Sequence, residues 1–298
     1  MRRMRLFLIL GTVLLLLCIG PVPVLADNGP ERTDLTGVRV AVWGETQNMV
    51  VSSGIALYAM FEWMNATVEY VFAEDIRAGV LDNYDLLAMP GGQIPSYYNA
   101  LDDDGIANIK QWIAEGGSYF GICGGALFLT SSSRFGIYNG TRALAVPGDF
   151  TSMHQIEMRI NTSCSGPDLS GLPENFSTLF WGSSYFIPDE GFPYIPIARY
   201  NDSGEPGMIA LEYEQGNAFL SSPHPEYEEG GNRDNTTEFD EFTDPDTEWD
   251  FLLRIAVWQI ESSLTDNQGI DSTNLILVVA VAGVVVIAIA VVVILRRR

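Results

Sequence analysis

The chain has 298 residues and a formal net charge of −22, from 38 acidic and 16 basic side chains. Such an acidic surface repels nucleic acid and anionic lipid headgroups, so we expect no nucleic-acid partner. Three cysteines in a chain of this length exclude a disulfide-rich scaffold.

The first 26 residues are typical of a secretory signal peptide. Three arginines precede a short apolar run, and Ala26 closes a small-x-small cleavage pattern. An uncleaved N-terminal anchor is the alternative, but Pro21 and Pro23 favour cleavage. The polar residues 27–36 that follow predict a flexible lead.

Residues 37–261 predict one α/β domain. Strand-like and helix-like segments alternate in its first half, which is typical of parallel βαβ units in a doubly wound, mostly parallel sheet with helices on both faces, a flavodoxin-like three-layer sandwich. The expected strands are Val38–Trp43, Thr67–Phe72, Leu86–Met89 and Ser118–Ile122, and the expected helices are Ser52–Met64, Asp102–Glu115 and one beginning at Gly124.

The second half of this domain has a different character after Arg134. It is rich in Gly, Pro, Asn and Ser, with a strongly acidic surface loop expected over residues 226–248 and a closing helix over Trp249–Glu261. Short strands are expected at Ile156–Ile160, Ile195–Tyr200, Met208–Glu212 and Asn217–Leu220.

The C-terminal end predicts a membrane anchor. A polar stalk over residues 262–274 leads into an apolar run over residues 275–295, long enough to cross a bilayer as one helix. Arginines at 296–298 predict a short cytoplasmic tail by the positive-inside rule. The expected location is the cell membrane, as a single-pass protein with its soluble domain outside, and the membrane is the expected partner.

Six Asn-x-Ser/Thr sequons support that outside location, because this tripeptide is the acceptor for N-glycosylation in secreted proteins. The candidate glycosylation sites are Asn65, Asn139, Asn161, Asn175, Asn201 and Asn235.

Cys123 is the strongest candidate for a reactive residue. It follows an expected strand, stands before Gly124 and Gly125, and precedes an expected helix. This is the pattern of a nucleophile elbow, in which a sharp turn lifts the side chain above the carboxyl edge of a sheet and the helix start favours the thiolate. A buried cysteine at a glycine-rich turn, or a disulfide with Cys164, is the alternative.

Two further segments complete a candidate site. His224 and Glu226 follow an expected strand in the sequence His-Pro-Glu, and residues two apart in an extended segment face the same side. A cysteine nucleophile needs such a base and an orienting carboxylate. After another strand, backbone amides at Gly92 and at Gly124 are placed where an oxyanion would form. Each segment alone also reads as a plain turn.

These three segments resemble the class I glutamine amidotransferase-like superfamily. The closer likeness is to the amidotransferase-like domain at the N-terminus of some biotin–protein ligases. It rests on Met89–Pro95, on Ile109–Ala126 and on His224-Pro225-Glu226, and it spans about Val38 to Glu226.

The resemblance implies a Cys–His–Glu triad, with Cys123 as nucleophile, His224 as general base and Glu226 orienting it. Gly92 and Gly124 would then form the oxyanion hole. Related cysteine-elbow families often place a histidine directly after the cysteine, and glycine at 124 favours the amidotransferase branch. The second histidine, His154, is not needed and is expected to be structural.

The function predicted from the sequence is that of a membrane-anchored extracytoplasmic cysteine hydrolase acting on an amide, glutamine amidotransferase-like in type. The alternative is a non-catalytic ligand-binding or sensing module on the same scaffold, since a fold does not fix a function. A purely structural cell-surface protein is a third reading. The ligand would be an unknown small molecule or peptide. We expect no cofactor and no metal, because neither ligand spacing nor a phosphate-binding glycine loop is present.

Overall fold

The computed structural model describes five stretches of the chain, of which the part from Thr33 onward forms one unit. The described residues are 32–46, 50–131, 133–228, 233–243 and 248–263.

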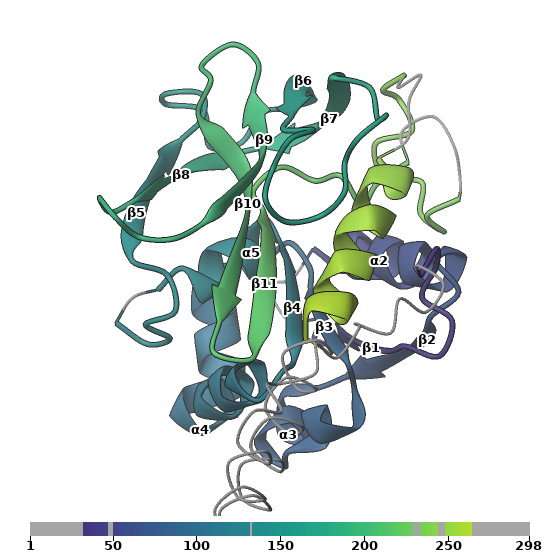
Figure 1. The fold of residues 1–298 in the computed structure, drawn as a ribbon, viewed down its shortest axis with the longest axis vertical. Helices are drawn as coiled ribbons and strands as arrows, with labels where there is room; N and C mark the ends of the chain where they lie inside the picture. Colours follow the sequence, from purple (N-terminus) through teal and green to yellow (C-terminus); the bar gives the residue numbers. More distant parts are fainter. Residues whose placement is uncertain (1–31, 47–49, 132, 229–232, 244–247, 264–298) are drawn as a thin grey trace, which may run out of the picture. The chain divides into compact units, whose positions relative to one another are not determined.

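Five parallel strands form the half of the central sheet that carries the expected βαβ pattern (Figure 1). Each lies where the sequence predicts a strand, and their order in the sheet is β2-β1-β3-β4-β11. Their bounds are β1 (Arg39–Trp43), β2 (Thr67–Val71), β3 (Leu86–Met89), β4 (Ser118–Ile122) and β11 (Gly216–Ser221).

Four antiparallel strands extend this sheet, which corrects the prediction of a mostly parallel one. They continue the order from β11 as β10 (Pro206–Tyr213), β9 (Ile195–Tyr200), β6 (Met153–Ile160) and β7 (Asn175–Trp181). The direction reverses because β10 and β11 are joined by a tight turn in which Glu214 has a φ of 53°. A hairpin turn of this kind requires antiparallel pairing.

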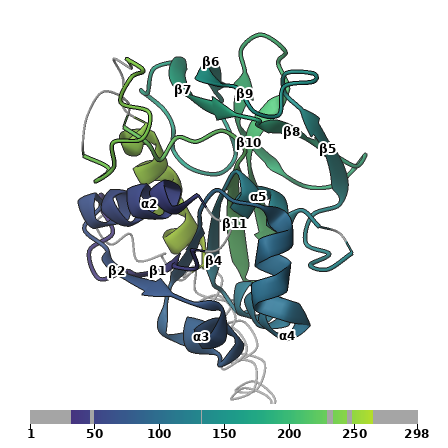
Figure 2. The same cartoon turned by 180° about the vertical axis from the view of Figure 1, so that it is seen from behind.

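Helices cover both faces of the parallel half (Figure 2). Helix α2 (Val51–Trp63) and the helix over residues 249–263 pack on one face. The short α3 (Ala73–Arg77), the 3-10 turn η1 (Val80–Asn83), α4 (Ile94–Ala114) and α5 (Gly124–Leu129) pack on the other.

The alternation along each strand explains the two cores. In β1, Val40 and Val42 contribute to the cluster under α2, while Ala41 and Trp43 contribute to the cluster under α4. Successive side chains of a strand point to opposite faces, so a strand buried on both faces must be apolar throughout.

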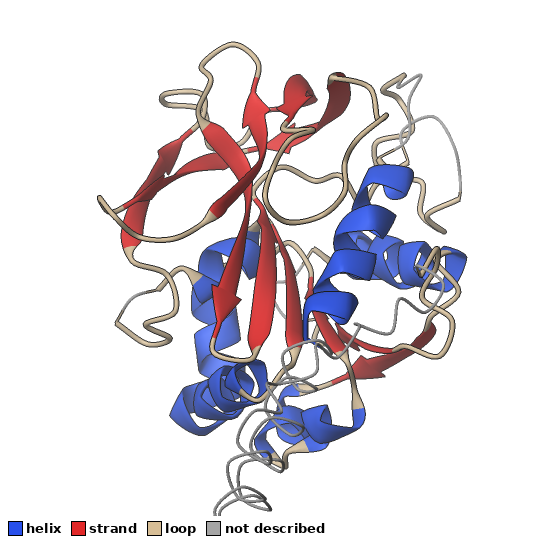
Figure 3. Ribbon diagram, viewed as in Figure 1, coloured by secondary structure: helices blue, strands red, loops and turns tan. Residues whose placement is uncertain are grey.

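The second half of the chain is built of strands and loops (Figure 3). Among the described residues between 130 and 248, none is helical. Besides the antiparallel strands, β5 (Gly140–Leu144) and β8 (Ser184–Pro188) pair as a separate two-stranded sheet.

The predicted membrane anchor is corrected by the structure. No helix of the described residues is long and apolar enough to cross a membrane. The longest of them, α4, has 21 residues and carries several charged side chains near its middle. The segments expected to form the signal peptide (1–26) and the anchor (275–295) lie outside the described residues. We therefore retain neither the membrane as a partner nor the location inferred from it.

Candidate active site

Cys123 sits at the turn between β4 and α5 with a strained backbone. Its φ is 47° and its ψ is −113°, a conformation that L-residues rarely adopt and that is typical of functional turns. Its backbone N–H donates to the carbonyl oxygen of Ser221 at 2.7 Å, which ties the turn to the neighbouring strand β11. The thiol is partly exposed and is not in a disulfide.

Glycine at 124 is required by how closely two turns approach. A Cβ atom added at Gly124 would lie 1.9 Å from the carbonyl oxygen of Gly92, far inside van der Waals contact. The turn after β3 therefore lies directly on the turn after β4, and Gly92 and Gly124 are brought together as the sequence predicts. The first N–H groups of a helix have no partner inside it, so the amide of Gly124 starts α5 without an intrahelical acceptor.

His224 and Glu226 form a fully buried pair beside this turn. The imidazole Nδ1 lies 2.8 Å from Oε1 of Glu226, and both side chains have 0% exposure. They follow the end of β11, and β11 pairs in parallel with β4, with Ser221 beside Ile122. Since the carboxyl ends of parallel strands meet at one edge of a sheet, the topology places the pair next to Cys123.

The charge around His224 favours its protonated form. Burial lowers the pKa of His224, but the Glu226 carboxylate and the Cys123 sulfur outweigh burial and raise that pKa to about 10. Cys123 contributes to this shift both by its charge and by a side-chain hydrogen bond with the imidazole, and the buried Nε2 has no further partner among the described residues. The side chain is therefore an imidazolium cation at neutral pH. Its Nε2–H remains available to a reacting group.

The antiparallel strands and the acidic segment hold the histidine in place. The backbone N–H of His224 donates to the carbonyl of Leu179 in β7 at 2.9 Å. The rings of Trp181 and Tyr227 lie 5.9 and 5.8 Å from the imidazole, measured between centroids. The segment expected as an acidic surface loop thus contributes buried aromatic rings, Tyr227 and Phe239, which pack edge to face.

Ser53 in α2 is a buried contact that the sequence did not indicate. Its hydroxyl donates to Oε1 of Glu226 at 2.6 Å and accepts the backbone N–H of Gly91 at 2.9 Å. A serine near a helix start is too common a feature to be singled out from sequence, because its meaning depends on which loop the fold brings to it.

The remaining candidate residues lie apart from this cluster in the sheet and loops. His154 on β6 stacks on Phe180 with ring centroids 4.6 Å apart. Cys164 is partly buried, burial raises the pKa of its thiol, and it is not in a disulfide. Of the six sequon asparagines, five are exposed and Asn161 is half-buried, which leaves their glycosylation a prediction. No group of three metal-ligating side chains is found in the described residues.

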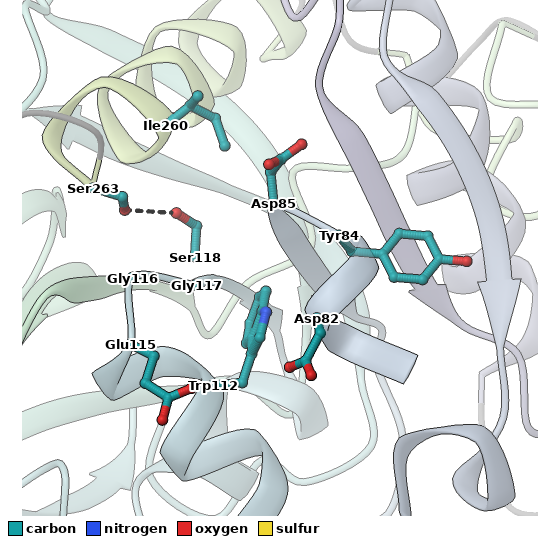
Figure 4. A pocket seen from close by; sticks show the side chains of 10 residues that line it. All are labelled: Asp82, Tyr84, Asp85, Trp112, Glu115, Gly116, Gly117, Ser118, Ile260 and Ser263. Carbon is teal, nitrogen blue, oxygen red and sulfur yellow. Dashed lines mark hydrogen bonds between the residues drawn. The ribbon is translucent and has the colours of Figure 1, made fainter. Parts of the chain in front are cut away.

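A cavity of about 300 Å³ lies at the other edge of the sheet (Figure 4). It is lined by Ser118, the first residue of β4, by Asp85 just before β3, and by Trp112 of α4. The hydroxyls of Ser118 and Ser263 are 3.2 Å apart across one wall. Cys123 follows the opposite end of β4, so this cavity is separate from the candidate active site.

Comparison with families and curated proteins confirms the suspected resemblance. Residues 81–154 match the family described as "Biotin-protein ligase, N terminal". An uncharacterized protein of Chlamydia muridarum (strain MoPn / Nigg) is 35% identical over 156 residues, which are 48% of this chain and 60% of that protein. The biotin–protein ligase of Schizosaccharomyces pombe is 23% identical over 165 residues, 49% of this chain and 26% of the ligase.

Solved structures are similar in fold. A ThuA-like protein from Bacteroides uniformis has a TM-score of 0.51 at 10% identity, covering 78% of this chain and 94% of that one. A glutamine amidotransferase from Thermotoga maritima has a TM-score of 0.45 at 14% identity, covering 77% and 97%. The chain thus shares its α/β fold with the ThuA-like protein and resembles the N-terminal domain of biotin–protein ligases over residues 81–154.

Proposed function

We propose that this protein is a cysteine-dependent acyl-transfer enzyme in which Cys123 forms a thioester. The observation that carries the proposal is the buried His224–Glu226 pair beside a strained cysteine turn. Burial lowers the pKa of His224, but Glu226 and Cys123 raise it to about 10. The proposal includes no membrane anchor, which corrects the membrane-anchored amide hydrolase expected from the sequence. The alternative, a non-catalytic binding module, finds no better support.

The first step is attack on an acyl donor. The sulfur of the Cys123 thiolate bonds to the carbonyl carbon, and the π electron pair moves to the oxygen, which the amides of Gly92 and Gly124 stabilise. When the carbonyl re-forms, the bond to the leaving group breaks, and the His224 imidazolium supplies the proton that the leaving group needs. A thioester on Cys123 and a neutral imidazole remain.

The second step releases the acyl group. Water or another nucleophile gives its proton to His224 as it bonds to the thioester carbon, and the Cys123 thiolate leaves with the electron pair of the C–S bond. Glu226 keeps the imidazole in one orientation through both steps, because its carboxylate accepts a hydrogen bond from Nδ1–H. The cycle returns the thiolate and imidazolium.

Alkylation of the full-length protein with iodoacetamide tests the nucleophile, because Cys164 in the same molecule is an internal control. We expect Cys123 to be labelled about tenfold faster than Cys164 or more at pH 7, since an ordinary cysteine is only a few per cent thiolate there. Mass spectrometry of the labelled peptides measures both rates. The His224→Gln variant should lose most of the difference.

p-Nitrophenyl acetate tests the acyl step. Its carbonyl carbon bonds to sulfur, p-nitrophenolate leaves, and an acetyl group on Cys123 is detected by mass spectrometry. Cys123→Ser should abolish the adduct, and His154→Gln should not affect it. Equal labelling of the two cysteines, together with no acetyl adduct on Cys123, would overturn the proposed function.

A further inference from the structure

The first turn of α2 connects two parts of the candidate active site. Ser53 belongs to this turn and is completely buried. Its hydroxyl oxygen accepts a hydrogen bond from the Gly91 amide at 2.9 Å, and its O–H donates a hydrogen bond to Oε1 of Glu226 at 2.6 Å. One small side chain therefore contacts both the turn before Gly92 and the carboxylate that orients His224.

The Gly91 turn is held against this helix from both sides. The backbone N–H of Val50 donates to the Gly91 carbonyl at 3.1 Å, so Gly91 has one bond to the helix through its oxygen and one through its nitrogen. A Cβ at Gly91 would lie 2.7 Å from Cε1 of His224. The turn and the imidazole ring are in direct contact, and a shift of either one moves the other.

The Ser53 hydroxyl is used both as a hydrogen-bond donor and as an acceptor. A hydroxyl can donate one hydrogen bond. Here it donates to the carboxylate, so its oxygen is available as an acceptor for the Gly91 amide. Oε1 of Glu226 then accepts two hydrogen bonds, one from the Ser53 hydroxyl and one from Nδ1–H of His224. Without Ser53, a buried amide and a buried carboxylate oxygen would each lose a partner, and such groups are costly to leave unpaired.

We propose that Ser53 is a positioning residue of this site, whose hydroxyl ties the Gly91–Gly92 turn to Glu226. This inference rests on the proposed function. Ser53 touches neither the acyl donor nor the sulfur. It acts through the turn that presents the Gly92 amide, so its role is expressed in the step that forms an oxyanion.

Two reactions of Cys123 separate this role from general stabilisation. Acetylation by p-nitrophenyl acetate passes through an oxyanion, whereas alkylation by iodoacetamide needs only the thiolate. In Ser53→Ala we expect the acetylation rate constant to fall by about tenfold or more, because a misplaced oxyanion donor costs about 10²–10³ when lost entirely. The alkylation rate should change by less than about threefold, because His224 keeps its bond to Glu226.

Ser52→Ala is the matched control. Ser52 is the neighbouring serine of the same turn, and its hydroxyl is bonded to the Tyr227 hydroxyl at 2.8 Å rather than to the triad. It should leave both rates unchanged. Ser53→Thr, which restores a hydroxyl, should recover part of the acetylation rate, and Ser53→Cys replaces Ser53→Ala if the alanine variant does not fold.

The outcomes distinguish the two proposals. Suppose that wild-type Cys123 accepts acetyl. If Ser53→Ala then slows both acetylation and alkylation by the same factor, or slows neither reaction, the role of Ser53 is refuted and the proposed function stands. If wild-type Cys123 accepts no acetyl, the Nδ1 proton resonance of His224 decides about Ser53, and the proposed function fails if Cys123 is also alkylated no faster than Cys164. A resonance that broadens or shifts in Ser53→Ala, but not in Ser52→Ala, supports the positioning role of Ser53. An unchanged resonance overturns that role.

Discussion

Gly124 occupies the most crowded point of the candidate site, because an added Cβ would overlap the backbone oxygen of Gly92. We expect Gly124→Ala to lower the free energy of unfolding by about 3 kcal/mol, the upper end for overpacking, and to slow acetylation of Cys123. Urea denaturation followed by tryptophan fluorescence measures the first effect.

Gly54→Ala is the control for that substitution. Gly54 is buried in α2, but its added Cβ would meet Trp43 and Pro90 only at 3.8 and 3.9 Å, which are ordinary contacts. Alanine is the better helix former, by about 0.8–1.0 kcal/mol, so Gly54→Ala should be neutral or stabilising. Equal losses in the two variants would show that the crowding at Gly124 is not what matters.

His224 makes stability depend on pH in a defined window. Burial lowers the pKa of His224, but Glu226 and Cys123 raise it by more. The net result is a pKa of about 10, above the ordinary value of 6.5. Folding therefore takes up a proton between these values. The contribution of the imidazole is complete below about pH 6.5 and is lost as the pH rises toward 10. In the proposed ion pair Cys123 gives up a proton as well, so the full slope near −1.4 kcal/mol per pH unit is expected only above about pH 8.5, where an unfolded thiol is ionised too.

Denaturation of wild type and His224→Gln between about pH 8.5 and 10 measures this slope. The variant should lose it, because glutamine does not titrate. His154→Gln should keep it, since that histidine lies on β6 and stacks on Phe180. The same slope in wild type and His224→Gln would mean that another group accounts for it.

At the residue scale, local motifs single out the three candidate residues, but not the residues that hold them in place. Cys123 stands in a glycine-flanked turn, and His224 and Glu226 share a short segment after a strand, so each carries a local pattern. Ser53 and Leu179 carry none. Their contacts with Glu226 and His224 arise from tertiary packing of elements far apart in the chain, which no local pattern encodes.

At the scale of elements, α4 contains a break that its sequence explains. Asp102 has a φ of 52° and a ψ of −166° inside the helix, and its Oδ1 accepts the backbone N–H groups of Asp104 and Gly105. It therefore acts as the N-cap of the second helical stretch. The sequence predicts a helix beginning there, and the structure adds a helical stretch before it.

Asp102→Ala should cost about 1 kcal/mol of unfolding free energy, because it removes this cap and leaves at a positive φ a residue whose side chain cannot form local hydrogen bonds. Asp102→Asn should stay close to wild type, since its amide oxygen accepts the same bonds. Thermal unfolding followed by circular dichroism compares them. A loss in the asparagine variant as large as in the alanine variant would contradict the capping role.

Elements with strong patterns were predicted well, and weakly patterned ones were not. Strands β3, β4 and β9 have the expected bounds, because they are short apolar or β-branched runs between turns. Strand β7 (Asn175–Trp181) was not expected, and neither were β5 and β8: β5 has no buried residue and follows neither period. Their two-stranded sheet forms by pairing with each other, a long-range condition that composition does not reveal.

For the whole molecule, the burial of strands predicts an order of stability. All residues of β4 and β11 are buried, and these strands pair with each other at the centre of the sheet. Their amides should exchange with solvent slowest, by global unfolding, whereas those of β5 should exchange fastest among the strands through local opening. Hydrogen–deuterium exchange read by mass spectrometry checks this order, and protection of β5 equal to that of β4 would contradict it.

The pairing of β4 with β11 has a consequence for how the protein matures. The thiol and its proton partner come from segments far apart in the chain, so during synthesis Cys123 emerges well before His224 does. Until that late, long-range pairing closes, the cysteine is an ordinary thiol at a loose glycine turn, because its partner is missing. Under the proposed function, reactivity is therefore acquired only with the completed fold.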